Sequence, residues 1–209
     1  MTVLAIDSDS DDLTRLGSQY RRDKVYPELR KKQIVVTEFK GAAPVRDLVK
    51  AAAKQEGVKY LTGVGHGVNR VIYTGNDLDE VYRVGNYEEA EVRGKIVHFL
   101  SCGIGNRLGK DFVSKGCAAF FGYKENFTFV EDAAEVFLEC DSKIDLAFAD
   151  GHTAEDVFVE VNRLFEQRVA ELKAAGKIYL AGWLDLNRRN LCGPSRTGTG
   201  FGDPQAKLV

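Results

Sequence analysis

The sequence has no long apolar run, and its N-terminus lacks the features of a leader. The longest apolar runs are far shorter than the roughly 20 residues that span a bilayer, so we expect no membrane partner. Residues 1–12 turn acidic after one short apolar run. They have neither the basic start nor the apolar core of a signal peptide, which predicts a cytoplasmic protein.

The cysteines and the charges exclude further classes. Four cysteines are present and none forms a CxxC pair, which argues against a zinc ribbon or a disulfide framework. Net charge is −2, and no basic stripe is available to contact phosphates, so we expect no nucleic-acid partner. With 44% hydrophobic residues, the 209 residues are sufficient for one α/β domain spanning residues 1–209.

Short β-rich runs alternate with helical patterns along the chain. Apolar runs predict buried strands at residues 3–6, 34–39, 60–65, 96–101 and 118–123. Helices are expected after Pro44, at residues 106–115, after Thr153 and around residues 178–186. Residues 69–93 read as a β-hairpin insertion without a helix. The alternation predicts an α/β fold of flavodoxin-like type, a mostly parallel sheet with helices on both faces.

Two of these strands end in residues that can carry chemistry. The third runs into Gly65-His66-Gly67, and the fourth runs into Ser101-Cys102-Gly103. In a 2-1-3-4-5 strand order these ends are neighbours, at the sheet edge where α/β proteins place their sites. A thiolate nucleophile beside an imidazole predicts acyl transfer, with the N–H groups of Gly67 and Cys102 binding the oxyanion. The dipole of the helix that follows Cys102 would favour the thiolate.

The other histidines and cysteines, and two further motifs, are weaker candidates for a functional site. Taken singly, a cysteine at a strand end or a His-Gly step is usually structural. His98 lies inside the fourth predicted strand and is expected in the core, whereas His152 precedes a helix cap and is expected at the surface. Cys117 and Cys140 fit the core, and Cys192 is ambiguous. A metal site from His66, His98 and Cys102 lacks a close-spaced ligand pair, so we expect no metal or cofactor. Residues 105–110 resemble a phosphate-binding loop but have the wrong spacing, which leaves nucleotide binding a minor alternative.

The strand–His66–Gly67 and strand–Ser101–Cys102–Gly103 segments resemble the dyad of the caspase-like cysteine peptidases. Residues 99–123 and the Gly-Asp-Pro at 202–204 are most similar to bacterial gingipain-like domains, and the likeness extends over about residues 34–204. The resemblance implies a three-layer caspase-like fold. It also implies a peptide or protein substrate, cleaved through a thioester with His66 as acid–base and Cys102 as nucleophile.

The sequence departs from these relatives in its specificity residues. Cys102 follows His66 by 36 residues (102 − 66), against roughly 50 in caspases, and no Gln-Ala-Cys motif is present. Leu100 stands where clostripain-like enzymes carry an acid. Asp7 or Glu125 could instead bind a basic side chain, with Ser101 also near the substrate. The alternative function is a catalytically silent caspase-like interaction module.

Overall fold

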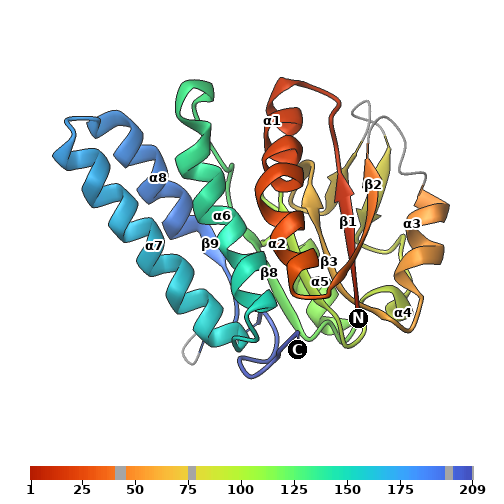
Figure 1. Ribbon diagram of the computed structural model, residues 1–209. Helices are drawn as coiled ribbons and strands as arrows, with labels where there is room; N and C mark the ends of the chain where they lie inside the picture. Colours follow the sequence, from red (N-terminus) through yellow and green to blue (C-terminus); the bar gives the residue numbers. More distant parts are fainter. Residues whose placement is uncertain (41–45, 75–78, 196–199, 209) are drawn as a thin grey trace.

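A six-stranded, mostly parallel sheet organises the molecule. The computed structural model describes residues 1–40, 46–74, 79–195 and 200–208. The strand order is β2-β1-β3-β7-β8-β9, in which the first five strands are parallel and β9 is antiparallel to β8 (Figure 1). This is the predicted 2-1-3-4-5 order of the five main strands, with one more strand at the edge. The α/β class and the parallel sheet are therefore confirmed.

The elements alternate along the chain as the sequence pattern indicates. The strands of the main sheet are β1 (Thr2–Asp7), β2 (Val35–Lys40), β3 (Val58–Val64), β7 (Ile96–Leu100), β8 (Ala119–Tyr123) and β9 (Leu191–Cys192). The helices are α1 (Asp12–Tyr20), α2 (Tyr26–Lys31), α3 (Arg46–Ala53), α4 (Glu89–Val92), α5 (Leu108–Ser114), α6 (Ala134–Ala149), α7 (Ala154–Ala174) and α8 (Ile178–Asn190). A π-helical turn, Arg21–Val25, joins α1 to α2, and a 3₁₀ turn, Glu131–Ala133, precedes α6.

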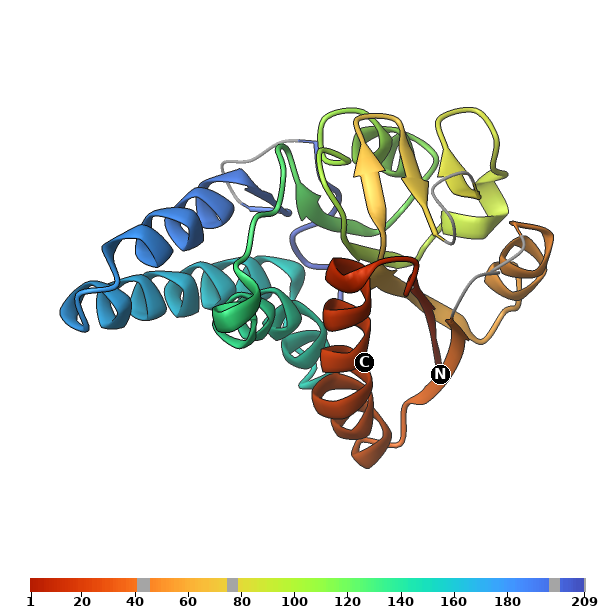
Figure 2. The ribbon, with the colours of Figure 1, turned by 90° about the horizontal axis from the view of Figure 1, so that it is seen from above.

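The main sheet is buried on both faces, which gives the protein three layers. Val3 and Ala5 of β1 belong to one apolar core, and Leu4 and Ile6 belong to the other, because successive strand residues point to opposite faces. The first core contains residues of α2, α6, α7 and α8, whereas the second contains residues of α3, α4, α5 and a small second sheet. Figure 2 shows α1 and the small sheet on opposite sides of the main strands.

The insertion between the third and fourth main strands is larger than predicted. It is a three-stranded antiparallel sheet of β4 (His66–Val68), β5 (Val71–Tyr73) and β6 (Glu80–Arg83), followed by the short helix α4. The hairpin prediction is thus confirmed in part, but the insertion begins at His66 and does contain a helix. Asn69 makes the tight turn between β4 and β5 at a φ of 24°, a region that asparagine tolerates.

Several helix predictions can be compared with the structure. Thr153 caps α7, and its hydroxyl accepts a hydrogen bond from the Asp156 N–H at 3.2 Å. Pro44, the expected start of another helix, lies outside the described residues. The helices α1 and α2 are not predicted from the sequence pattern, and they flank the π-helical turn that carries the buried Arg21. Within the described residues no helix combines the length and apolarity needed to cross a membrane.

Candidate active site

The site lies at the carboxyl ends of two neighbouring strands. β3 and β7 pair in parallel from Tyr60 with Ile96 to Val64 with Leu100. Just past this ladder the Gly65 N–H donates to the Leu100 carbonyl at 3.2 Å, which holds the two chain ends together. His66 and Cys102 are the second residues beyond these strands. The predicted adjacency of the two strand ends is therefore confirmed.

His66 has a carboxylate partner that the sequence interpretation missed. Its Nε2 contacts the Asp11 carboxylate, and both side chains are about two-fifths exposed. Asp11 is also the N-cap of α1, accepting a hydrogen bond from the Thr14 N–H at 2.8 Å. Slight burial opposes ionisation of Asp11, but the hydrogen bonds from Thr14 and His66 outweigh it and lower its pKa. The capping pattern Asp11-x-x-Thr14 was the available signal, since it predicts a fixed carboxylate after the first strand.

The thiol of Cys102 is half-buried and its proton is held more firmly than expected. Burial raises its pKa, and a backbone hydrogen bond at Phe127 only partly offsets that effect. The expectation of a thiolate favoured by a helix dipole is therefore wrong. The helix α5 begins at Leu108, six residues after Cys102, too far for an effect that fades within one turn.

Both side chains line one small cavity of about 90 Å³. Its lining comes from four places in the chain: α1, the segments that follow β3 and β7, and the loop after β8. The lining residues are Leu13, Thr14, Val64, Gly65, His66, Leu100, Ser101, Cys102, Phe127 and Phe129. His66 and Cys102 thus border a common space whose other walls are mostly apolar.

Gly67 lies directly against the loop that carries the thiol. A Cβ at Gly67 would be 2.7 Å from the Cys102 carbonyl oxygen and would also collide with the Ser101 hydroxyl. Only glycine permits this close approach. The amide of Gly103 is already used, because it donates to the Glu125 carbonyl at 3.1 Å. The predicted oxyanion donors Gly67 and Cys102 stay a prediction, and their backbones lie side by side.

The three predicted substrate contacts have different fates. Ser101 is buried and lines the cavity, and its hydroxyl has no hydrogen-bond partner among the described residues. Glu125 is exposed in the loop after β8, and its side chain does not line the cavity. Asp7 is only 1% exposed and is enclosed in a hydrogen-bonded cluster. This burial does not fit the expectation that Asp7 could bind a basic side chain of the substrate.

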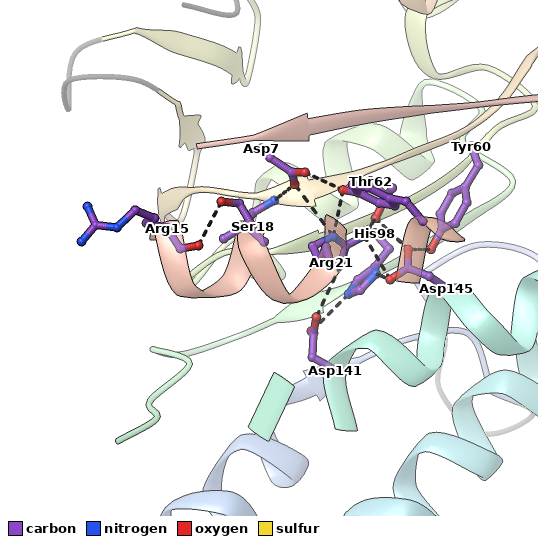
Figure 3. A network of polar contacts seen from close by, with 11 residues as sticks. Asp7, Arg15, Ser18, Arg21, Tyr60, Thr62, His98, Asp141 and Asp145 are labelled. Carbon is purple, nitrogen blue, oxygen red and sulfur yellow. Dashed lines mark hydrogen bonds and ion pairs between the residues drawn. The ribbon is translucent and has the colours of Figure 1, made fainter. Parts of the chain in front are cut away.

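Asp7 belongs to a buried group of charged side chains beneath the site. Arg21, itself 1% exposed, lies 3.8 Å from Asp7 and Asp141 and 3.1 Å from Asp145 (Figure 3). Burial raises the pKa of Asp7 to about 6, against the opposing effects of Arg21 and a 2.6 Å hydrogen bond from Tyr26. Asp7 in turn accepts the Val64 N–H at 3.2 Å, so the group supports the strand that leads to His66.

His98 is a member of the same group and not of the cavity. Its two ring nitrogens lie 3.2 Å from Asp141 and 3.2 Å from Asp145. Burial alone would lower the pKa of His98, but the two carboxylates raise it to about 9. The prediction of a satisfied core histidine is confirmed, and His98 does not line the cavity that holds His66 and Cys102.

The remaining candidates lie away from the cavity. His152 is partly exposed and lies 2.8 Å from Glu160. Cys117, Cys140 and Cys192 are buried, and burial raises the pKa of each thiol. In the part of the chain that the structure describes, no group of three or more His, Cys, Asp or Glu side chains is placed to hold a metal ion.

No protein-family model matches this chain, and no curated protein is significantly similar to it.

Proposed function

We propose that the protein is a caspase-like cysteine peptidase that hydrolyses peptide bonds with Cys102 as nucleophile and His66 as acid–base. One observation carries the proposal: His66 and Cys102 line the same cavity from neighbouring strands. A contact between His66 and the Asp11 carboxylate supports it, because a third group commonly orients the base in such sites. Asp11 is a positioning residue, since it acts through the imidazole.

The reaction begins with a neutral thiol. His66 accepts the Cys102 proton as the sulfur attacks the carbonyl carbon of the substrate, forming a C–S bond and an oxyanion. The N–H groups of Gly67 and Cys102 receive that negative charge. The C–N bond then breaks, and the imidazolium returns its proton to the leaving amine. A water molecule hydrolyses the thioester, giving the carboxylic acid product and restoring the thiol.

The raised pKa of Cys102 decides how the proton moves. A thiol held protonated by burial has little thiolate at neutral pH, so the base must act during the attack and not before it. The contact with Asp11 stabilises the imidazolium that forms in this step. The arrangement therefore favours general-base activation of the thiol over a preformed ion pair.

A pool of internally quenched peptides with varied sequences tests the proposal. Cleavage by the wild type should be lost in Cys102→Ala and in His66→Ala. The matched control is His152→Ala, which removes another partly exposed histidine far along the chain and should leave cleavage unchanged. If the wild type cleaves nothing, or if Cys102→Ala retains cleavage, the peptidase proposal is wrong. The catalytically silent interaction module would then be the better description.

A further inference from the structure

The wall of the cavity beside Cys102 is apolar, which bears on the substrate. Five lining residues carry aliphatic or aromatic side chains: Leu13, Val64, Leu100, Phe127 and Phe129. Phe127 is buried, whereas Leu13 is 46% exposed and forms part of the rim. Burial of an apolar group against such walls is favourable, at about 25 cal/mol per Å² of apolar surface removed from water.

No carboxylate lines this cavity within the described residues. Asp11, the carboxylate beside His66, already contacts that imidazole and accepts the Thr14 N–H. Asp7 is held by Tyr26 and Arg21 beneath the strand ends. A lysine or arginine side chain entering the cavity would lose its hydration without gaining a partner, which is strongly unfavourable.

The size of the cavity points in the same direction. Its volume is about 90 Å³, well below the roughly 300–1,000 Å³ of typical ligand pockets. A small space with mostly apolar walls favours a short apolar side chain over the long charged chain of arginine or lysine. The buried Ser101 hydroxyl has no partner among the described residues and lines the same cavity. It can satisfy a polar backbone atom of a bound peptide.

We propose that this cavity is the specificity pocket, and that it accepts a small, uncharged, apolar side chain. The residue concerned is the one whose carbonyl carbon Cys102 attacks. This inference rests on the proposed peptidase function. It replaces the expectation of a basic side chain at that position, which needed an acid that the cavity lacks.

Matched peptides test the inference directly. Four internally quenched peptides of identical sequence would carry Val, Phe, Lys or Asp at the residue before the scissile bond. We expect kcat/KM for Val to exceed that for Lys and Asp by at least about tenfold, since a single methylene in an apolar pocket already changes this ratio 10–200-fold. Val should also exceed Phe, because the cavity is small.

A substitution designed to reverse the substrate preference provides a second test. Leu13→Glu places a carboxylate at the rim, in the first turn of α1 where an acidic residue is tolerated well. It should shift the Lys-to-Val ratio of kcat/KM at least tenfold toward Lys. The control is Leu16→Glu, which changes a similarly exposed leucine of the same helix that does not line the cavity. Its ratio should equal that of the wild type.

The outcomes separate the two proposals. Cleavage that requires Cys102 but favours Lys or Asp, or an unchanged ratio in Leu13→Glu, overturns the pocket assignment and leaves the peptidase standing. Peptidyl chloromethyl ketones with Val or Lys provide an independent readout by intact mass. Absence of both cleavage and Cys102 labelling overturns the peptidase proposal, and the pocket assignment with it.

Discussion

At the scale of single residues, the proposed nucleophile Cys102 and the proposed base His66 have different surroundings. Burial keeps the proton on Cys102, whereas Asp11 is held ionised beside His66. A nucleophile of this kind is protected from oxidation and stray alkylation at rest, because reactivity follows the thiolate. Its activation then depends on how well the imidazole is oriented.

Alkylation measures this property of Cys102. At neutral pH iodoacetamide should label Cys102 before the other three thiols, because Cys117, Cys140 and Cys192 are buried. The labelling rate should keep rising up to and above pH 9, since burial raises the Cys102 pKa above its ordinary value. Peptide mapping by mass spectrometry across pH 6–10 provides the measurement. A rate that is already maximal at pH 7 would show a preformed thiolate and contradict the expectation.

The Asp11 carboxylate has two partners, and two substitutions separate them. Asp11→Asn retains an N-cap for α1 but removes the negative charge beside His66. We expect kcat to fall about tenfold or more, part of the 10²–10⁴ that a well-placed acid–base group contributes, with an unchanged melting temperature. Asp11→Ala should lose the same activity and about 1 kcal/mol of stability in addition.

Steady-state kinetics and thermal melts of both Asp11 variants decide the matter. If Asp11→Asn has wild-type kcat over the full pH range, then Asp11 only caps the helix. A change in KM with kcat unchanged would also contradict a role for Asp11 in orienting the base.

At the scale of elements, the small sheet β4-β5-β6 orients the residues that follow β3, among them His66 and Gly67. It holds His66 opposite Tyr73 and brings Gly67 against the Cys102 loop. Strand register determines which face a side chain occupies, so a slip of one residue in β4 would turn the imidazole to the other face. The main sheet places the carboxyl ends of β3 and β7 side by side, and the small sheet sets the orientation of His66 and Gly67 beyond β3.

Substitution of Gly67 tests this close packing. Gly67→Ala should lower kcat/KM by more than tenfold and destabilise the fold by about 1–3 kcal/mol, because the added methyl overlaps the Ser101 hydroxyl and the Cys102 carbonyl oxygen. The comparison is Gly182→Ala in α8, where nothing lies within 4 Å of the added atom. There we expect unchanged activity and about 1 kcal/mol of added stability. Equal behaviour of the two variants would refute the steric argument.

A second element-scale feature is the buried charge group that joins β1, β3 and β7 to Arg21 and α6. Its members around His98 predict a particular pH dependence of stability. Because the folded pKa of His98 is raised to about 9, its contribution is present below pH 6.5 and is lost as pH rises through about 9. Each pKa unit corresponds to about 1.4 kcal/mol, so the loss amounts to about 3 kcal/mol.

Urea unfolding at pH 6 and at pH 9.5 measures this contribution. The wild type should lose stability between the two values, and His98→Gln should lose much less, while being less stable at pH 6. Were the two proteins to respond equally to pH, the charged state of His98 in the fold would be ruled out.

Only some residues of the site could be predicted from the sequence. Apolar strands ending in His66 and Cys102 were predictable, because local pattern and parallel topology together fix the strand ends. Leu13 and Phe129 were not, since they come from α1 and from the loop after β8, which only tertiary packing brings to the cavity. The same packing brings Asp11, the N-cap of α1, to His66. The thiol pKa was mispredicted because α5 begins later than its pattern suggested and burial dominates.

At the scale of the whole molecule, both ends of the chain close on the same sheet. The helix α8 leads directly into β9, which pairs with β8, and Gly202 forms a bridge with Ala119 of β8. Ala181 and Leu184 of α8 belong to the core that also contains Val3 and Tyr26. We therefore expect the distant α7–α8 hairpin, seen at the left of Figure 1, to unfold together with the sheet.

The single tryptophan reports on this expectation. Trp183 lies on α8 and packs partly against the first core. Its fluorescence and the far-UV circular dichroism signal should give coincident urea transitions, as in two-state unfolding. An earlier fluorescence transition would mean that the α7–α8 hairpin opens on its own.

The turn at Asn69 has a consequence for how such a protein could change over time. Two residues join β4 to β5, and β4 starts with His66 itself. Insertion or loss of one residue there would change the register of β4 against β5 and so turn the imidazole of His66 to the other face of the small sheet. For the proposed peptidase, a single codon in this hairpin would therefore separate an active enzyme from an inert scaffold. A protein with this architecture could lose the proposed activity in one step and keep its fold.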